Sequence, residues 1–148
     1  MSMAGQTSQL IFASRLTGNA RWWSTGIRLA AGLTLISVSL SKFTRHQDLV
    51  EAFERYGIPF PEQSVYLAGT VEGVGGVLLI LGFVTRIAAL VVAGNMAVAV
   101  LTGGRIDVDL YHTGLGSLLF AAAVFLVWSG PGRWAVDNAW VDPTAEED

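Results

Sequence analysis

The sequence predicts an all-α integral membrane protein: a bundle of four transmembrane helices with a short amphipathic helix between the first two spans. Hydrophobic residues make up 52% of the 148 residues. Charged residues make up only 14%, against about 25% in soluble proteins. Mean hydropathy is +0.51, and the only charged residues between positions 65 and 101 are Glu72 and Arg86. Because lipid offers no partners for backbone polar groups, we expect the spans to be helices.

The first two spans are predicted at residues 22–40 and 65–83. Each is close to the length of about 20 residues that crosses about 30 Å of hydrocarbon. The apolar patch upstream of Trp22 is too short for the hydrophobic region of a cleavable signal. We therefore expect the first span to remain as an anchor, preceded by an N-terminal cytoplasmic segment, residues 1–21.

The connection between these two spans, residues 44–63, contains apolar side chains at helical spacing. Acidic side chains, among them Glu51 and Glu54, lie around the opposite face. This pattern predicts an amphipathic helix that lies on the membrane surface or caps the bundle; a solvated loop helix is the alternative. The apolar stripe consists of Leu49, Val50, Phe53 and Tyr56.

The last two spans are predicted at residues 87–101 and 110–128. The third is short, and the fourth reaches the length of a span only if Tyr111 and His112 belong to it. A polar loop is expected between them at residues 102–109, because this segment contains glycines and charged residues.

A single membrane domain, residues 22–137, is therefore expected, followed by an acidic flexible tail, residues 138–148. Four spans place both termini on one side. Arg15 and Arg21 precede the uncleaved first span and favour cytoplasmic termini. We accordingly expect a multi-pass protein of the cell (inner or plasma) membrane, surrounded by the lipid bilayer.

Several classes of function are disfavoured by what the sequence lacks. Without cysteine, thiolate metal sites, iron–sulfur clusters and disulfide chemistry are excluded. The net charge of −3 offers no basic patch for nucleic acid. Only His46 and His112 are available, which disfavours a bis-histidine haem. No metal site and no covalently bound cofactor are expected.

Glu72 is the sharpest functional candidate because a carboxylate at membrane depth is costly and normally has a partner. Positions three and four residues away carry small side chains, which place Glu72 on a helix-packing face. Its expected partners are Lys42, Asn95 and Arg28. A purely structural carboxylate that fixes helix register is the alternative. The small residues are Ala68, Gly69, Gly75 and Gly76.

The other polar residues at depth are candidates for a site or for structural roles, and for His112 the alternative is an interfacial histidine without a ligand. Arg28 and Lys42 lie near opposite ends of the first span, as candidates for a site or as interfacial anchors that snorkel. Asn95 is a candidate for bridging helices by hydrogen bonding. At the start of the fourth span, His112 is oriented by Asp109 in our interpretation. Together with Lys42 and Glu72, His112 would form a site for a polar head group or for proton transfer.

Several short motifs, in this order and spacing, resemble the DoxX family of small four-helix bacterial membrane proteins. They run from about Arg28 to Asp137. Ala135 and Ser39 depart from the serine and glycine that are common in the family. The motifs are Arg28-x3-Gly32, Lys42-Phe43, Tyr56-Gly57-Ile58-Pro59-x-Pro61, Glu72-x2-Gly75-Gly76, Leu81-Gly82-x2-Thr85-Arg86 and Gly130-Pro131-Gly132-Arg133-x3-Asp137.

The resemblance implies a membrane subunit associated with redox systems, since founding members are similar to a small subunit of a thiosulfate:quinone oxidoreductase. We therefore expect an accessory subunit of a redox or respiratory assembly that contacts quinone and other membrane subunits, and that is not an enzyme alone. Two alternatives remain open. One is a structural interaction subunit of a larger membrane complex, and the other is a small transporter or proton path that uses Glu72.

Overall fold

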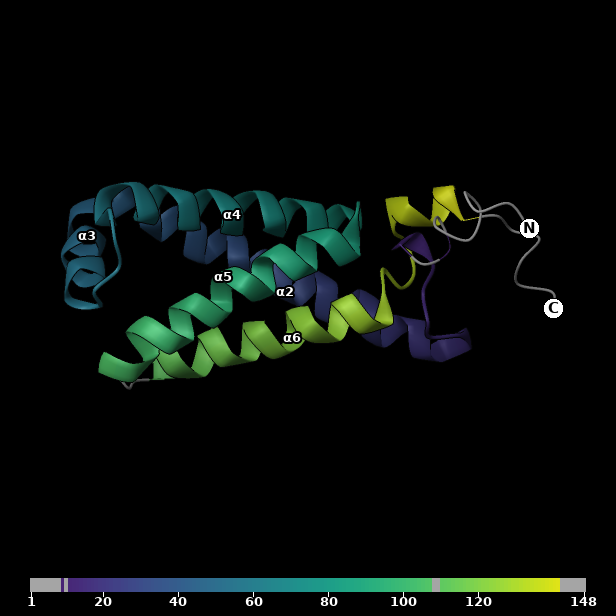
Figure 1. Cartoon of the computed structure of the whole chain (residues 1–148). Coiled ribbons are helices and arrows are strands. Elements are labelled where there is room, and N and C mark those ends of the chain that lie inside the picture. The colour runs from purple at the N-terminus through teal and green to yellow at the C-terminus, as the bar shows by residue number, and fades with distance from the viewer. Residues whose placement is uncertain (1–8, 10, 108–109, 142–148) are drawn as a thin grey trace.

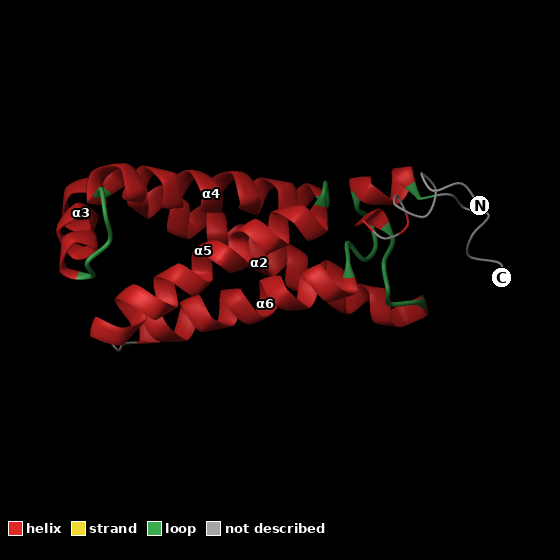
Figure 2. Ribbon diagram, in the orientation of Figure 1, coloured by secondary structure: helices red, strands yellow, loops and turns green. Residues whose placement is uncertain are grey.

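The computed structural model describes residues 9, 11–107 and 110–141, and this part of the chain consists of helices and their connections, without any strand (Figure 2). The predicted all-α class is therefore confirmed. The α-helices are α2 (Arg21–Thr44), α3 (His46–Arg55), α4 (Pro61–Leu81), α5 (Thr85–Ile106) and α6 (Gly116–Ser129). Short helical segments of other kinds are η1 (Gly18–Ala20), η2 (Leu110–Leu115) and η3 (Val136–Trp140).

Three segments of the described chain are long and apolar enough to cross a membrane: η1 with α2, then α4, then α5. The α6 helix is equally apolar but shorter. It follows directly on η2, a π-helical segment, so that the helical path runs from Leu110 to Ser129, where the fourth span is predicted. The protein is an integral membrane bundle of four helical segments.

The third span is longer than the sequence suggested. We expected a polar loop from residue 102, whereas α5 continues as a helix to Ile106 and reaches 22 residues. Gly103 and Gly104 are tolerated in this part of the helix because other residues pack against them. A Cβ built on Gly103 would lie 2.9 Å from the ring of Tyr56, and Gly104 faces Thr113. The prediction of a loop was wrong because glycine and charge were counted as a break although tertiary contacts hold the helix together.

The helices α2 and α4 cross at a point where neither has a side chain. A Cβ built on Gly32 would lie 2.8 Å from the carbonyl oxygen of Gly76, and one built on Gly76 would lie 2.8 Å from that of Gly32. Glycine at both positions therefore permits the close approach of the two backbones. Nearby, the hydroxyl of Ser39 donates to the carbonyl oxygen of Gly69 at 2.7 Å, so serine fits here and ties the two helices together.

The bundle consists of two helix pairs, α2 with α4 and α5 with α6 (Figure 1). The helices α4 and α5 are joined by a tight turn, residues 82–84, and diverge from it toward α3 (Figure 1). We call these two ends of the bundle the turn end and the α3 end. At the α3 end, the hydroxyl of Tyr56 donates to Asp107 at 2.5 Å and so connects the segment after α3 with the end of α5.

The α3 helix has the amphipathic character that the sequence predicts. Leu49, Val50 and Phe53 are half-buried, whereas Glu51 and Glu54 are exposed. The buried side packs against α4 and α2. Of the predicted arrangements, the structure shows a helix that caps one end of the bundle.

The chain after α6 folds back over the turn end. The carboxylate of Asp137 is fully buried and accepts the backbone N–H groups of Val84 at 2.6 Å and Thr85 at 2.8 Å. It therefore satisfies donors that the first turn of α5 leaves unpaired. Asn138 lies within η3 and accepts a hydrogen bond from Arg21 at 3.2 Å. The acidic residues of the predicted tail, from position 142 onward, lie outside the described residues.

Candidate functional site

Three polar side chains from three different helices meet inside the bundle. The ammonium Nζ of Lys42 lies 2.7 Å from Oε2 of Glu72 and forms an ion pair with it. The amide Nδ2 of Asn95 donates to the other oxygen, Oε1, at 3.2 Å. The side chain of Glu72 is only 3% exposed, and that of Lys42 is 13% exposed. The predicted pairing of Glu72 with Lys42 and Asn95 is therefore confirmed.

Helix geometry explains why Lys42 and Glu72 meet although their positions differ in depth. Side chains in a helix tilt toward its N-terminus. The helices α2 and α4 run in opposite directions, so Lys42, near the end of α2, extends inward while Glu72 extends toward it. Gly69 leaves the room they need, because a Cβ at this position would lie 3.2 Å from the Cβ of Lys42.

Asn95 completes the cluster from α5, where the two helix pairs still touch. A Cβ built on Gly75 would lie 2.7 Å from Val92, one turn before Asn95. At this level α4 and α5 are close enough for the amide to reach Glu72. The glycines around Glu72 thus serve two contacts, Gly69 and Gly76 toward α2 and Gly75 toward α5.

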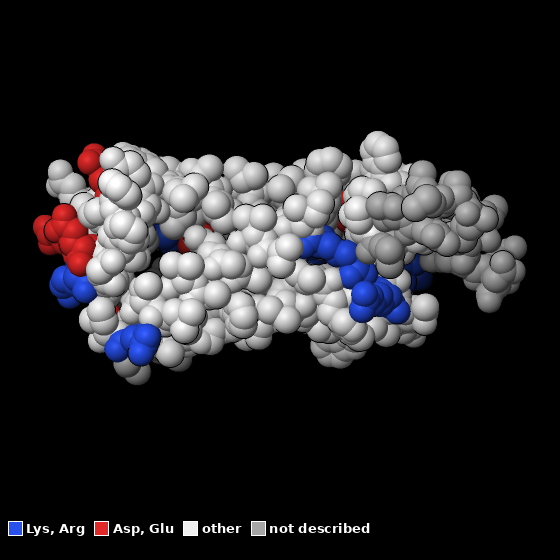
Figure 3. Space-filling view, viewed as in Figure 1, with Lys and Arg blue, Asp and Glu red and all other residues white. Residues whose placement is uncertain are grey.

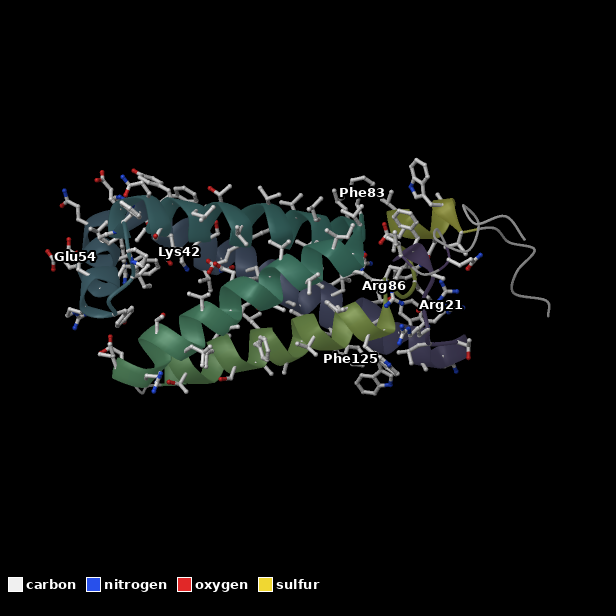
Figure 4. The ribbon with its side chains drawn as sticks, viewed as in Figure 1. Arg21, Lys42, Glu54, Phe83, Arg86 and Phe125 are labelled. Atoms are coloured by element: carbon white, nitrogen blue, oxygen red, sulfur yellow. The ribbon has the colours of Figure 1, made fainter. Side chains whose placement is uncertain are left out.

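The cluster lies beside a hollow between the helix pairs. Figure 4 shows Lys42 between α4 and α5, near the α3 end. In the same view, Figure 3 shows the surface hollowed at this position, with blue and red atoms visible inside it. The surroundings on this face are uncharged (Figure 3). Charged atoms are therefore visible from the side of the bundle, among residues that carry no charge (Figure 3).

The arrangement offers hydrogen-bond donors and an acceptor within one small volume. An ammonium group has three donors, and Glu72 is the partner that the structure gives to Lys42. Each carboxylate oxygen of Glu72 receives one hydrogen bond and has a lone pair left. The site is thus suited to a molecule whose polar head carries carbonyl or hydroxyl oxygens and whose remainder is apolar.

Arg28 does not belong to this cluster and does not snorkel, contrary to the interpretation as an interfacial anchor. It is 1% exposed. Its guanidinium donates to the carbonyl oxygens of Ile80 at 3.3 Å, Arg133 at 3.3 Å and Trp134 at 3.1 Å. Arg28 therefore fastens the end of α4 and the segment after α6 to α2. The interpretation of Lys42 as an interfacial anchor is likewise replaced by the ion pair.

The remaining predicted site residues cannot be placed in the cluster. Asp109 and the side chain of His112 lie outside the described residues. Asp107, from the same polar segment, is bound to Tyr56 and lies 3.9 Å from Arg55. Among the described residues, no group of three His, Asp or Glu side chains has the spacing of a metal site.

Two further polar residues have structural roles that the sequence reasoning did not assign. Asp137 caps the start of α5, a role that its place at the end of the last sequence motif does not indicate. Arg86 donates to the carbonyl oxygens of Val127, of Trp128 at 3.0 Å and of Ala13 at 3.0 Å. Both residues bind backbone groups, and a sequence pattern contains no information on which distant backbone group a side chain reaches.

The fold and the buried cluster together define a small multi-pass membrane protein with a charged site inside its helix bundle. Comparison with known proteins agrees with this class. The family model described as DoxX matches residues 24–105, a range that contains Arg28, Lys42, Glu72 and Asn95. The chain belongs to the DoxX family, as its motifs suggested.

A relative in Mycobacterium tuberculosis, described as an uncharacterized membrane protein, is 37% identical over 128 residues. The alignment covers 76% of this chain and 77% of that protein. No solved structure gives a significant match. The comparisons therefore show the family and the membrane class.

Proposed function

We propose that this DoxX-family protein is an accessory membrane subunit of a redox or respiratory assembly, and that it holds the polar head of a quinone at Lys42, Glu72 and Asn95. The observation that carries the proposal is the ion pair beside the hollow between the helix pairs, with Asn95 on its second oxygen. A charged residue inside a membrane domain that lines a cavity commonly marks a ligand or ion pathway.

The chemistry of a quinone matches this site. Its two carbonyl oxygens accept hydrogen bonds, and Lys42 has donors besides the one directed at Glu72. In the reduced quinol, the hydroxyl groups donate, and the carboxylate of Glu72 accepts. The apolar tail would lie along the apolar helices and the lipid. In this proposal the partner subunits supply and take up the electrons, while this chain binds and orients the quinone.

The orientation and the compartment belong to the same proposal. We infer that the protein lies in the bacterial inner membrane with both ends of the chain in the cytoplasm. Arg15 precedes α2 and Arg21 is its first residue, both at the turn end, where Arg86 and Arg133 also lie. Cationic residues next to a span favour the cytoplasmic side.

A direct test measures the binding of a short-tailed quinone to the purified protein in lipid nanodiscs by calorimetry. Asn95→Leu removes one donor from the site and leaves the Lys42–Glu72 ion pair in place. We expect it to weaken binding about tenfold, as for the loss of one hydrogen bond of about 1.4 kcal/mol. Ser37→Ala, on the exposed face of α2, is the matched control and should bind like the wild type.

Three results would overturn the proposal in different ways. No binding of quinone by the wild type, with a partner protein co-purifying, would favour a purely structural subunit. Equal affinity of the wild type and Asn95→Leu would place the quinone elsewhere. Flux of a solute or of protons through the isolated protein in liposomes would favour a transporter.

No observation favours a complete proton path through Glu72. From Glu72 toward Arg28, the buried side chains of α2 and α4 are apolar or absent, among them Leu35, Leu79 and Gly76. In the described part of these two helices, no titratable side chain lies between Glu72 and Arg28. The side chains of α2 and α4 therefore offer no relay for a proton from Glu72 toward the turn end.

A further inference from the structure

The two ends of the bundle carry opposite charge in the described part of the chain. At the turn end, cations clearly outnumber carboxylates; the charged residues there are Arg15, Arg21, Arg28, Arg86, Arg133 and Asp137. At the α3 end, carboxylates outnumber cations; the charged residues there are Lys42, Arg45, Asp48, Glu51, Glu54, Arg55, Glu62, Glu72, Arg105 and Asp107. Figure 3 shows blue side chains gathered near the turn end, and red side chains together with some blue ones at the α3 end.

Tryptophan follows the same division. The chain has five tryptophans, and all of them lie at the turn end: Trp22, Trp23, Trp128, Trp134 and Trp140. Their exposed fractions run from 40% for Trp22 to 77% for Trp134. Exposed tryptophan is typical of the level at which lipid head groups meet the hydrocarbon. We therefore expect the exposed arginines of the turn end at the height of lipid phosphates.

Two of these arginines have guanidinium donors that are available to a ligand. Arg21, Arg28 and Arg86 donate to groups of the protein itself. Arg15 and Arg133 are exposed, and within the described residues neither guanidinium has a hydrogen-bonding or ion-pair partner.

One contact fixes the guanidinium of Arg133 and another fixes the backbone of Arg15, and neither uses a guanidinium N–H donor. The guanidinium of Arg133 lies 5.3 Å from the centre of the Trp22 ring, an aromatic face that itself packs edge-on against Trp134. The backbone N–H of Arg15 donates to Ser129 at 2.8 Å, at the end of α6, where the like charge of Arg86 is close enough to act on it. The repulsion between two neighbouring positive charges decreases when an anion binds between or beside them.

We propose that the turn end binds anionic phospholipids, with Arg15 and Arg133 each donating to a lipid phosphate and the neighbouring tryptophans packing on the glycerol and upper acyl chains. The phosphate is the lipid group that matches the planar set of guanidinium donors. This site is separate from the proposed quinone site and uses none of its residues.

The chain contains one competing source of negative charge. Beyond Val141 the sequence has Asp142, Glu146, Glu147 and Asp148. If these carboxylates neutralised the two arginines, the full chain would not prefer anionic lipid. The experiment therefore includes a variant that ends at Val141.

The test compares retention of phosphatidylglycerol and phosphatidylcholine by the purified full chain, using native mass spectrometry over a lipid titration. We expect tighter binding of phosphatidylglycerol. Arg15→Gln and Arg133→Gln should each weaken it about fivefold, and the double variant about 25-fold, because an arginine near an anionic surface contributes about that factor. Arg105→Gln, exposed at the α3 end, is the matched control and should leave binding unchanged.

Equal binding of the two lipids by the full chain would overturn the proposal. A preference that appears only after residues 142–148 are removed would assign the arginines to the chain's own carboxylates, and would overturn it as well. So would a loss in Arg105→Gln equal to that in the two test variants. Quinone binding should be the same in all of these variants, which separates this test from that of the proposed function.

Discussion

The ion pair between Lys42 and Glu72 permits a quantitative test by a double-mutant cycle. Glu72→Gln keeps the shape of the side chain and an acceptor for Asn95, but it leaves the ammonium of Lys42 inside the bundle without its counter-charge. Lys42→Met leaves the carboxylate with only the amide of Asn95. The side chain of Lys42 is 13% exposed and that of Glu72 is 3% exposed, so water compensates little for the loss of either partner.

The magnitudes follow from this burial. Breaking a buried pair by removing one partner costs about 3–5 kcal/mol, so each single variant should lose about that much free energy of unfolding. Replacing both partners leaves no uncompensated charge, and the double variant should lie within about 1 kcal/mol of the wild type. The coupling energy of the cycle should therefore be at least about 5 kcal/mol.

The assay is reversible unfolding of the purified protein in mixed micelles, followed by circular dichroism against increasing denaturing detergent. Arg55→Met is the matched control, because Arg55 lies 3.9 Å from Asp107 and its side chain is 64% exposed. It should cost at most about 1 kcal/mol. Additive effects of the two substitutions, or single variants as stable as the control, would refute the reasoning that the pair is buried and mutually dependent.

Two further predictions concern the turn end. Asp137→Ala removes the acceptor for the backbone N–H groups of Val84 and Thr85. Since each buried unpaired donor costs about 1–3 kcal/mol, it should lower the free energy of unfolding by about 2–6 kcal/mol. Asn138→Ala, measured by the same unfolding titration, should cost clearly less. For topology, a reporter that works only in the cytoplasm should be active when it is fused to the C-terminus. Activity of a reporter that works only on the outer side of the membrane would contradict the inferred orientation.

The sequence predicted those features that depend on periodicity and depth. Glycine at three and four residues from Glu72 indicated a helix contact, and this placed the carboxylate inside the bundle correctly. Depth alone put Lys42 and Asn95 within reach of it. The amphipathic helix α3 was predicted because its apolar and acidic residues alternate with helical spacing.

The sequence did not predict features that depend on contacts between distant segments. The sequence offers Arg28 as a site residue or as an interfacial anchor, because its actual partners, the carbonyl oxygens of Ile80, Arg133 and Trp134, have no sequence signature. The end of α5 was predicted as a loop because the ring of Tyr56, which packs on Gly103, comes from another part of the chain. In both cases a tertiary contact overrides a local propensity.

The helices are held together by different kinds of contact at the two ends of the bundle. At the turn end, Arg28 and Asp137 bind backbone groups, and the crossing at Gly32 and Gly76 fixes α2 against α4. Because main-chain groups are fixed by the helices themselves, this end has little freedom to rearrange. At the α3 end the helix pairs diverge, and a side-chain contact between Tyr56 and Asp107 connects α3 with α5. In the two proposals, a quinone enters between the diverging helix pairs, whereas lipid phosphates bind on the surface of the turn end.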